Sequence, residues 1–176
     1  NALSLLNDVA PYPHILLDNE RQLQLLRGKV GMLNMYPVAN TAFAKLFSQI
    51  LKLSSEQSPI QSFDSKDLEK CLAVDGRIFV GSALVANAAD PSLGATIFQN
   101  CLTRSPCPVP KSRPSTGTIL LVATSEMASN PEVSKHLDAA ISYVGGRTTT
   151  LFSGVYVKEN LPGLVAILLM SGLKEE

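Results

Sequence analysis

Residues 36–51 read YPVANTAFAKLFSQIL. The apolar residues of this stretch recur at spacings of three and four, which places them on one face of a helix of about five turns. They are Val38, Ala39, Ala42, Phe43, Leu46, Phe47, Ile50 and Leu51. Pro37 suits the first turn of such a helix. We therefore expect a largely buried helix from about Tyr36 to Ser54, packed on one side by a sheet formed later in the chain.

The residues around this helix alternate short apolar runs with helical patterns. Strands are expected at 14–17, 77–82, 118–124, 148–157 and 164–173, and shorter helices at 21–26, 66–72, 92–102 and 131–144. Four of the strands follow the long helix. The expected fold class is α/β, in which a long central helix precedes a two-layer α/β domain with an approximately four-stranded mixed sheet.

The composition excludes several classes of function. The chain is 45% hydrophobic and carries 15 basic and 15 acidic residues. It therefore has no excess of positive charge with which to bind nucleic acid or acidic lipid. No apolar run approaches the roughly 18 residues needed to span a bilayer. Cys71, Cys101 and Cys107 are scattered and odd in number, so we expect free thiols in a reducing compartment. We expect no nucleic acid partner, no direct membrane insertion and no bound metal.

Two clusters of polar residues lie before the long helix and in its first turns. Asp18-Asn19-Glu20 follows the first apolar run, and Tyr36 and Asn40 stand four residues apart, on one face of the helix. Both clusters also have ordinary structural explanations. Asp18 and Asn19 can cap the next helix, and Tyr36 can fill a hydrophobic interface beside an exposed asparagine.

A third cluster, Phe63-Asp64-Ser65-Lys66-Asp67-Leu68, follows the long helix. Its carboxylates stand three residues apart. A purely structural role is equally open for them, with Asp64 capping the helix at 66–72 and Asp67 interacting with the dipole of its first turn.

In this order, the three clusters resemble those of the tubulin/FtsZ superfamily. Tubulins carry a similar Asp-Asn-Glu and a Tyr-x-x-x-Asn at the start of their central helix, and FtsZ proteins carry an Asp-x-x-Asp loop after it. Residues 75–81 resemble the Gly-x-x-x-x-Gly strand that follows this loop in the family, and residues 146–172 resemble the two closing strands. The resemblance covers most of the chain and lies in pattern and order rather than in identity.

The resemblance implies a role for each candidate residue. Asn19 would hydrogen-bond the guanine edge, Tyr36 would stack on the base, and Asn40 would bond its edge. Asp64 and Asp67 would enter the nucleotide site of the next subunit and position or polarise the attacking water. The cofactor would be GTP or GDP, with Mg²⁺ accompanying the nucleotide. The partners would be related subunits in a head-to-tail cytoskeletal filament, together with cell-division regulators.

The sequence departs from the family at two places. Ser58-Pro59 stands where the family has Pro-Gly, and Lys66 adds a charge beside the aspartates. The glycine-rich phosphate loop of the superfamily occurs nowhere in the chain, and no side chain substitutes well for its backbone N–H groups.

We therefore expect a fragment of a longer protein. Residues 1–35 would be a remnant of the nucleotide-binding domain, 36–56 the central connecting helix, and 57–176 a C-terminal FtsZ/tubulin-like activation domain. The isolated chain is expected to be inactive, and GTPase activity would need a full-length polymer.

Two alternatives stay open. A divergent, non-hydrolysing FtsZ-like accessory regulator of bacterial or plastid division is favoured by the departures around Asp64. A small α/β enzyme unrelated to tubulins is the other alternative, although the sequence offers it no Ser/His/Asp set, metal site or paired-carboxylate cleft. The expected location is the cytoplasm, or alternatively the chloroplast stroma.

Overall fold

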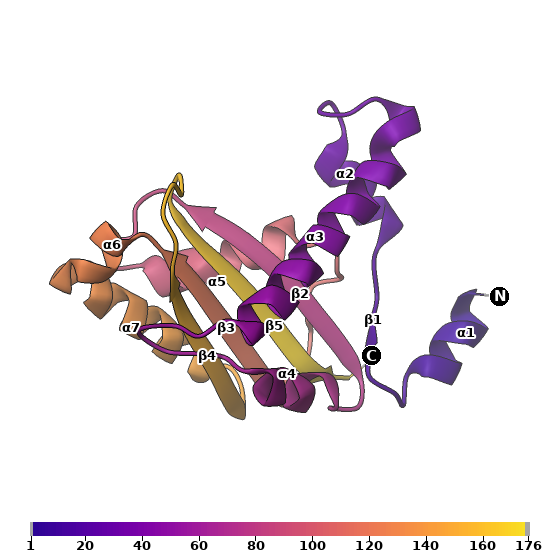
Figure 1. Cartoon of the computed structure of the whole chain (residues 1–176). Coiled ribbons are helices and arrows are strands. Elements are labelled where there is room, and N and C mark those ends of the chain that lie inside the picture. Colours follow the sequence, from indigo (N-terminus) through magenta and orange to yellow (C-terminus); the bar gives the residue numbers. More distant parts are fainter. Residues whose placement is uncertain (1, 175–176) are drawn as a thin grey trace.

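The computed structural model describes residues 2–174 of the chain (Figure 1). The helices are α1 (Ala2–Val9), α2 (Asn19–Leu26), the short 3-10 helix η1 (Met32–Asn34), α3 (Met35–Ser55), α4 (Ser65–Leu72), α5 (Leu93–Arg104), α6 (Ser125–Ser129) and α7 (Pro131–Gly145). The strands are β1 (His14–Ile15), β2 (Arg77–Val85), β3 (Thr116–Ala123), β4 (Thr150–Val157) and β5 (Leu164–Leu173).

The strands form one mixed five-stranded sheet in the order β1-β2-β5-β3-β4. The pairs β1–β2 and β3–β4 are parallel, whereas β5 runs antiparallel to both β2 and β3. Every residue of β3 is buried, as is typical of an interior strand with both faces covered. The expected α/β fold with four strands after the long helix is confirmed, and the short strand β1 adds a fifth.

Helices cover both faces of this sheet (Figure 1). On one face, buried residues of α5 and α7, such as Ile97 and Leu137, pack against alternate residues of β3 and β5. On the other face, the end of α3 and the short helix α4 pack against the intervening residues. The period-2 alternation of β3 and β5 therefore divides the core into two clusters, one on each side.

The expectation that the long helix is largely buried is wrong for most of its length. Only Ile50, Leu53 and Ser54 are buried, all near the C-terminal end of α3. Tyr36, near the other end, keeps 48% of its surface exposed. The core on this face of the sheet includes α3 residues from Leu46 onward, and helix α2 packs beside the part of α3 farther from the sheet (Figure 1). The apolar periodicity identified the correct face, but it carries no information about what covers that face.

The first apolar run forms less structure than expected. A buried strand over residues 14–17 was predicted, whereas β1 has only two residues and both are half-buried. It lies at the edge of the sheet and pairs with Arg77 and Ile78 alone.

Candidate functional site

The first polar cluster begins helix α2. The Oδ1 atom of Asp18 accepts a hydrogen bond from the amide of Arg21 at 3.0 Å, so Asp18 is the helix cap. Asn19 is exposed in the first turn, and its side-chain amide makes no hydrogen bond within residues 2–174. The structure thus separates the two residues, with Asp18 used by the fold and Asn19 left accessible.

Arg21, which no motif in the sequence marks, fixes α2 against the end of α5. Its guanidinium donates to the carbonyl oxygens of Leu102 at 2.5 Å, Thr103 at 3.2 Å and Ser105 at 2.7 Å. The last carbonyl groups of a helix have no partner within the helix itself. The positive charge of Arg21 at this end of α5 therefore also interacts favourably with the helix dipole. The partners lie more than eighty residues along the chain, so no local pattern announces the interaction.

The second polar cluster lies on the exposed half of α3. Tyr36 and Asn40 stand one turn apart, and both are exposed. Their side chains make no hydrogen bond within the described range 2–174. Helix α2 packs beside this half of α3, which brings the helix of Asn19 next to the helix of Tyr36 and Asn40. No hydrogen bond joins the three residues to one another.

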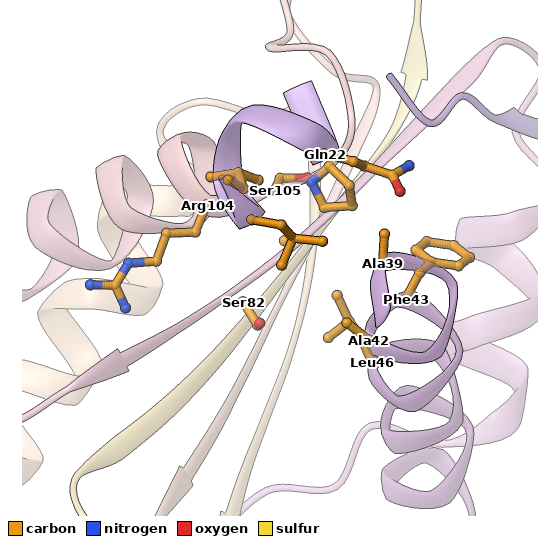
Figure 2. Close-up of a pocket in the computed structure, with 12 residues that line it drawn as sticks. Gln22, Ala39, Ala42, Phe43, Leu46, Ser82, Arg104 and Ser105 are labelled. Carbon is orange, nitrogen blue, oxygen red and sulfur yellow. The ribbon is translucent and has the colours of Figure 1, made fainter. Parts of the chain in front are cut away.

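Between α2, α3 and β2 lies a mostly apolar cavity of about 210 Å³. Figure 2 shows Ala39, Ala42, Phe43 and Leu46 along the α3 wall, with Gln22 above them. Gln22 is only 4% exposed. The cavity belongs to the packing of α2 on α3, and none of the predicted site residues lines it.

The loop between α3 and α4 is tied to strand β4. The amide of Val155 donates to the carbonyl oxygen of Gln61 at 2.8 Å, and the Ser58 hydroxyl bonds the carbonyl oxygen of Val155. Phe63, at the end of the loop, is fully buried. Its amide donates to the Tyr156 hydroxyl at 2.9 Å, and that hydroxyl donates to its carbonyl at 3.0 Å. The loop is therefore a rigid segment lying along the edge of the sheet.

Asp64 and Asp67 come directly after this fixed segment and form a capping box. Asp64 Oδ1 accepts from the amide of Asp67 at 2.9 Å, and Asp67 Oδ2 accepts from the amide of Asp64 at 3.4 Å. The structural role considered from the sequence is thus present. The other oxygen of each carboxylate makes no hydrogen bond within residues 2–174. Asp64 is exposed and Asp67 half-buried, so both can be reached from outside.

The two groups of predicted site residues lie at opposite ends of α3. The helix has 21 residues, and a helix of that length spans about 30 Å. Tyr36 stands at its start, whereas Asp64 follows its end. One small ligand therefore cannot contact both groups within a single copy of the chain.

The thiols belong to the core. Burial raises the pKa of Cys71 and Cys107 above the ordinary value, and it raises the pKa of Cys101 to about 12. Protonated, buried thiols are poor nucleophiles. Burial also raises the pKa of Tyr156, whereas hydrogen bonds from Ser125 lower the pKa of the exposed Glu159 carboxyl.

Within residues 2–174 no three His, Cys, Asp or Glu side chains lie together as a metal site would require. In the same part of the chain, no helix combines the length and apolarity needed to cross a bilayer.

The fold matches solved structures of filament proteins. The GDP-form protofilament of TubZ from Bacillus thuringiensis serovar israelensis superimposes on 90% of this chain with a TM-score of 0.71 and 17% identity. The GTPγS-bound protofilament of CetZ2 from Haloferax volcanii covers 92% with a TM-score of 0.70 and 18% identity. An FtsZ dimer from M. jannaschii covers 90% with a TM-score of 0.66 and 12% identity.

This chain spans less than half of those proteins, at 44% of the TubZ chain, 46% of the CetZ2 chain and 44% of the FtsZ chain. No family model and no curated protein matches the sequence. The chain therefore has the fold of the C-terminal domain of tubulin/FtsZ-like filament proteins, and the resemblance seen in the sequence is confirmed at the level of fold.

Proposed function

We propose that this chain is the assembly and activation portion of a GTP-dependent, tubulin/FtsZ-like filament protein. In this proposal, the loop after α3 stimulates GTP hydrolysis in the adjacent subunit. The observation that carries the proposal is the anchoring of Phe63 by Tyr156, which holds Asp64 and Asp67 at an accessible surface. Because these aspartates lie a helix length from Tyr36, they are suited to act on a neighbour's nucleotide.

The base-contacting side would be formed by α2 and α3. The side-chain amides of Asn19 and Asn40 make no hydrogen bond to any of residues 2–174, and the Tyr36 ring is half-exposed, which fits a purine edge and face. The neighbours solved in GDP and GTPγS forms support nucleotide binding in the complete protein. The triphosphate and its Mg²⁺ would be held outside this chain, because no glycine-rich phosphate loop is present in its sequence.

The proposed division of the chain follows from these roles. Residues 1–35 would belong to the nucleotide-binding side, 36–56 would connect the two sides, and 57–176 would form the activation domain. The filament forms of TubZ and CetZ2 support head-to-tail association with related subunits.

In the activation step, the outward oxygens of the two aspartates would act on the neighbour's water. Each carboxylate uses one oxygen in the capping box and keeps the other for an external donor. Tying the inner oxygens to backbone amides fixes the direction of the outer ones, which is what positioning a water requires.

The second candidate is a non-hydrolysing regulator of bacterial or plastid division, acting in the cytoplasm or the chloroplast stroma. The capping box favours it, because Asp64 and Asp67 already have a structural task. The exposed Lys66 between them also favours it, since it adds a charge that the family's loop does not carry. Such a regulator would bind filament subunits through the same end of the domain without accelerating hydrolysis.

A mixing experiment separates the two candidates. In the complete filament protein, an Asp67→Ala variant is mixed with a variant disabled in its phosphate loop, and GTP turnover is measured. Recovery of turnover in the mixture supports a site shared between subunits, because each variant supplies what the other lacks. If the unmodified protein hydrolyses no GTP at any concentration yet alters the assembly of a related filament protein, the regulator interpretation is correct.

A further inference from the structure

A second concave surface lies on the face of the sheet that α5 and α7 cover. Its volume is about 400 Å³, and it lies where α5 ends and the proline-rich loop leads into β3. The apolar residues of the lining include Met170, which belongs to the core cluster on that side, and Phe98 and Leu102, which are partly buried and pack against that cluster. The loop carrying Asp64 packs on the opposite face, so this surface is separate from the site described above.

Three cations line the same cavity, namely Lys111, Arg113 and Arg147. Among residues 2–174 no acidic side chain lines it, although the whole sequence has a net charge of +0. Within residues 2–174, none of the three forms an ion pair. Lys158, by contrast, is paired with Glu56 at 2.9 Å.

Both guanidinium groups are already held by neighbouring groups, that of Arg147 by helix α7 and that of Arg113 by the turn between α7 and β4. Arg147 lies 3.5 Å from the centroid of the Tyr143 ring and donates to the Tyr143 carbonyl at 2.9 Å. Arg113 donates to the carbonyl of Thr148 at 2.9 Å. Each guanidinium has five N–H donors, so most remain for a ligand. Groups ordered in advance lose less conformational entropy when they bind.

We propose that this cavity binds a short acidic segment of a partner polypeptide. Glu or Asp side chains of the segment would accept hydrogen bonds from Arg113 and Arg147, whose planar guanidiniums match a carboxylate. An adjacent apolar side chain would lie on Phe98 and Leu102. The apolar lining favours a peptide over a small inorganic anion, which would leave that surface exposed to water. Lys111 at the exposed rim would add long-range attraction that salt screens.

The test measures fluorescence anisotropy of two labelled peptides with the full chain. One peptide alternates Glu and Leu, and the matched neutral peptide alternates Gln and Leu. We expect saturable binding of the acidic peptide only, weakened by salt. The double variant Arg113→Gln/Arg147→Gln should weaken it by at least about tenfold, since two charge-assisted hydrogen-bond pairs are lost.

Two further variants keep the test decisive. Lys135→Gln removes one charge from an exposed position of α7 outside the cavity, and binding should stay within about twofold of the unmodified chain. Lys111→Glu reverses an exposed charge that bonds none of residues 2–174, so it should keep the fold and still weaken binding.

The proposal is overturned by any of three results. The first is equal affinity for the two peptides, and the second is an equal loss in Lys135→Gln and in the double variant. The third is full displacement of the acidic peptide by equimolar tripolyphosphate, which would identify a site for small anions. None of these outcomes depends on GTP turnover.

Discussion

The hydroxyl of Tyr156 donates to the carbonyl oxygen of Phe63 at 3.0 Å and accepts from the amide of the same residue at 2.9 Å. One phenol on strand β4 thus satisfies both backbone polar groups of a fully buried residue. The next residue is Asp64, the cap of α4. Together with the hydrogen bonds of Ser58 and Gln61 to Val155, this side chain therefore holds the segment that leads into both candidate carboxylates against the sheet.

Replacing Tyr156 with Phe should destabilise the chain by about 1–3 kcal/mol, because a buried amide and carbonyl lose their partner. Urea unfolding measures the loss. Tyr143→Phe is the matched control, since that hydroxyl makes no hydrogen bond within residues 2–174 and the ring contact with Arg147 is kept. Equal stability of the two variants would show that the Tyr156 hydroxyl does not anchor the loop.

The burial pattern of α3 leads to a second prediction, about the stability cost of alanine substitutions along the helix. Leu53 is 1% exposed, and Leu53→Ala should cost about 2–5 kcal/mol as a core truncation. Leu51 is 47% exposed, and Leu51→Ala should cost less than about 1 kcal/mol. Chemical denaturation of both variants tests the assignment. Similar costs at the two positions would mean that the exposed side of α3 is covered in solution.

The sequence predicted those parts of the fold that local pattern controls. The apolar run of β5 was expected at residues 164–173, where the strand lies, and the helix expected at residues 131–144 corresponds to α7. The short helix α6 was missed, because its five residues are too few for a periodic signal. The prediction that α3 is largely buried was wrong, because its burial depends on which other elements pack against it.

In the candidate site, too, the sequence predicted the local features but not the long-range contacts. The spacing of Asp64 and Asp67 is visible in the sequence, and so is their ability to cap a helix. The anchoring of this segment by Tyr156 is not visible, because the two partners lie 93 residues apart. Arg21 is a comparable case, since its acceptors are carbonyl oxygens at the end of a distant helix. Interactions with backbone groups leave no signature in the identity of the accepting residue.

Alkaline pH should weaken the fold. Burial raises the pKa of Cys101 from 9.0 to about 12, so the folded chain favours the protonated thiol. The stability this contributes is fully present below about pH 9 and is lost as pH rises toward 12. Urea midpoints at about pH 8 and about pH 10.5 should therefore differ, with less difference in Cys101→Ala. A midpoint that does not change over this range would contradict the burial of the thiol.

The isolated chain should bind GTP weakly or not at all, because its sequence lacks a phosphate loop. Calorimetry that gave micromolar affinity would refute this expectation. In the complete protein, Tyr36→Ala should weaken nucleotide binding by about 1–3 kcal/mol, the usual contribution of base–aromatic stacking. Tyr12→Ala is a suitable control, because Tyr12 is also exposed and lies outside the candidate site. Unchanged affinity in Tyr36→Ala would remove the stacking role.

We propose that Asp67 acts on a neighbour's nucleotide in addition to completing the capping box with Asp64. Asp67→Asn keeps an oxygen that can accept from the Asp64 amide, but it removes the carboxylate. Asp64→Asn is the matched variant for the cap, because Asn caps helices as well as Asp does. Both variants should therefore stay within about 1 kcal/mol of the stability of the unmodified protein, since each loses only the interaction of its charge with the helix dipole.

The decisive measurement is GTP turnover by the complete protein at several concentrations, alongside filament formation. Turnover should rise faster than linearly with concentration, because each site needs two subunits. Asp67→Asn should lower it by at least about tenfold while filaments still form, since a carboxylate that positions water contributes about 10²–10⁴ in rate. Undiminished turnover in Asp67→Asn, with stability unchanged, would show that the aspartate serves the helix cap alone.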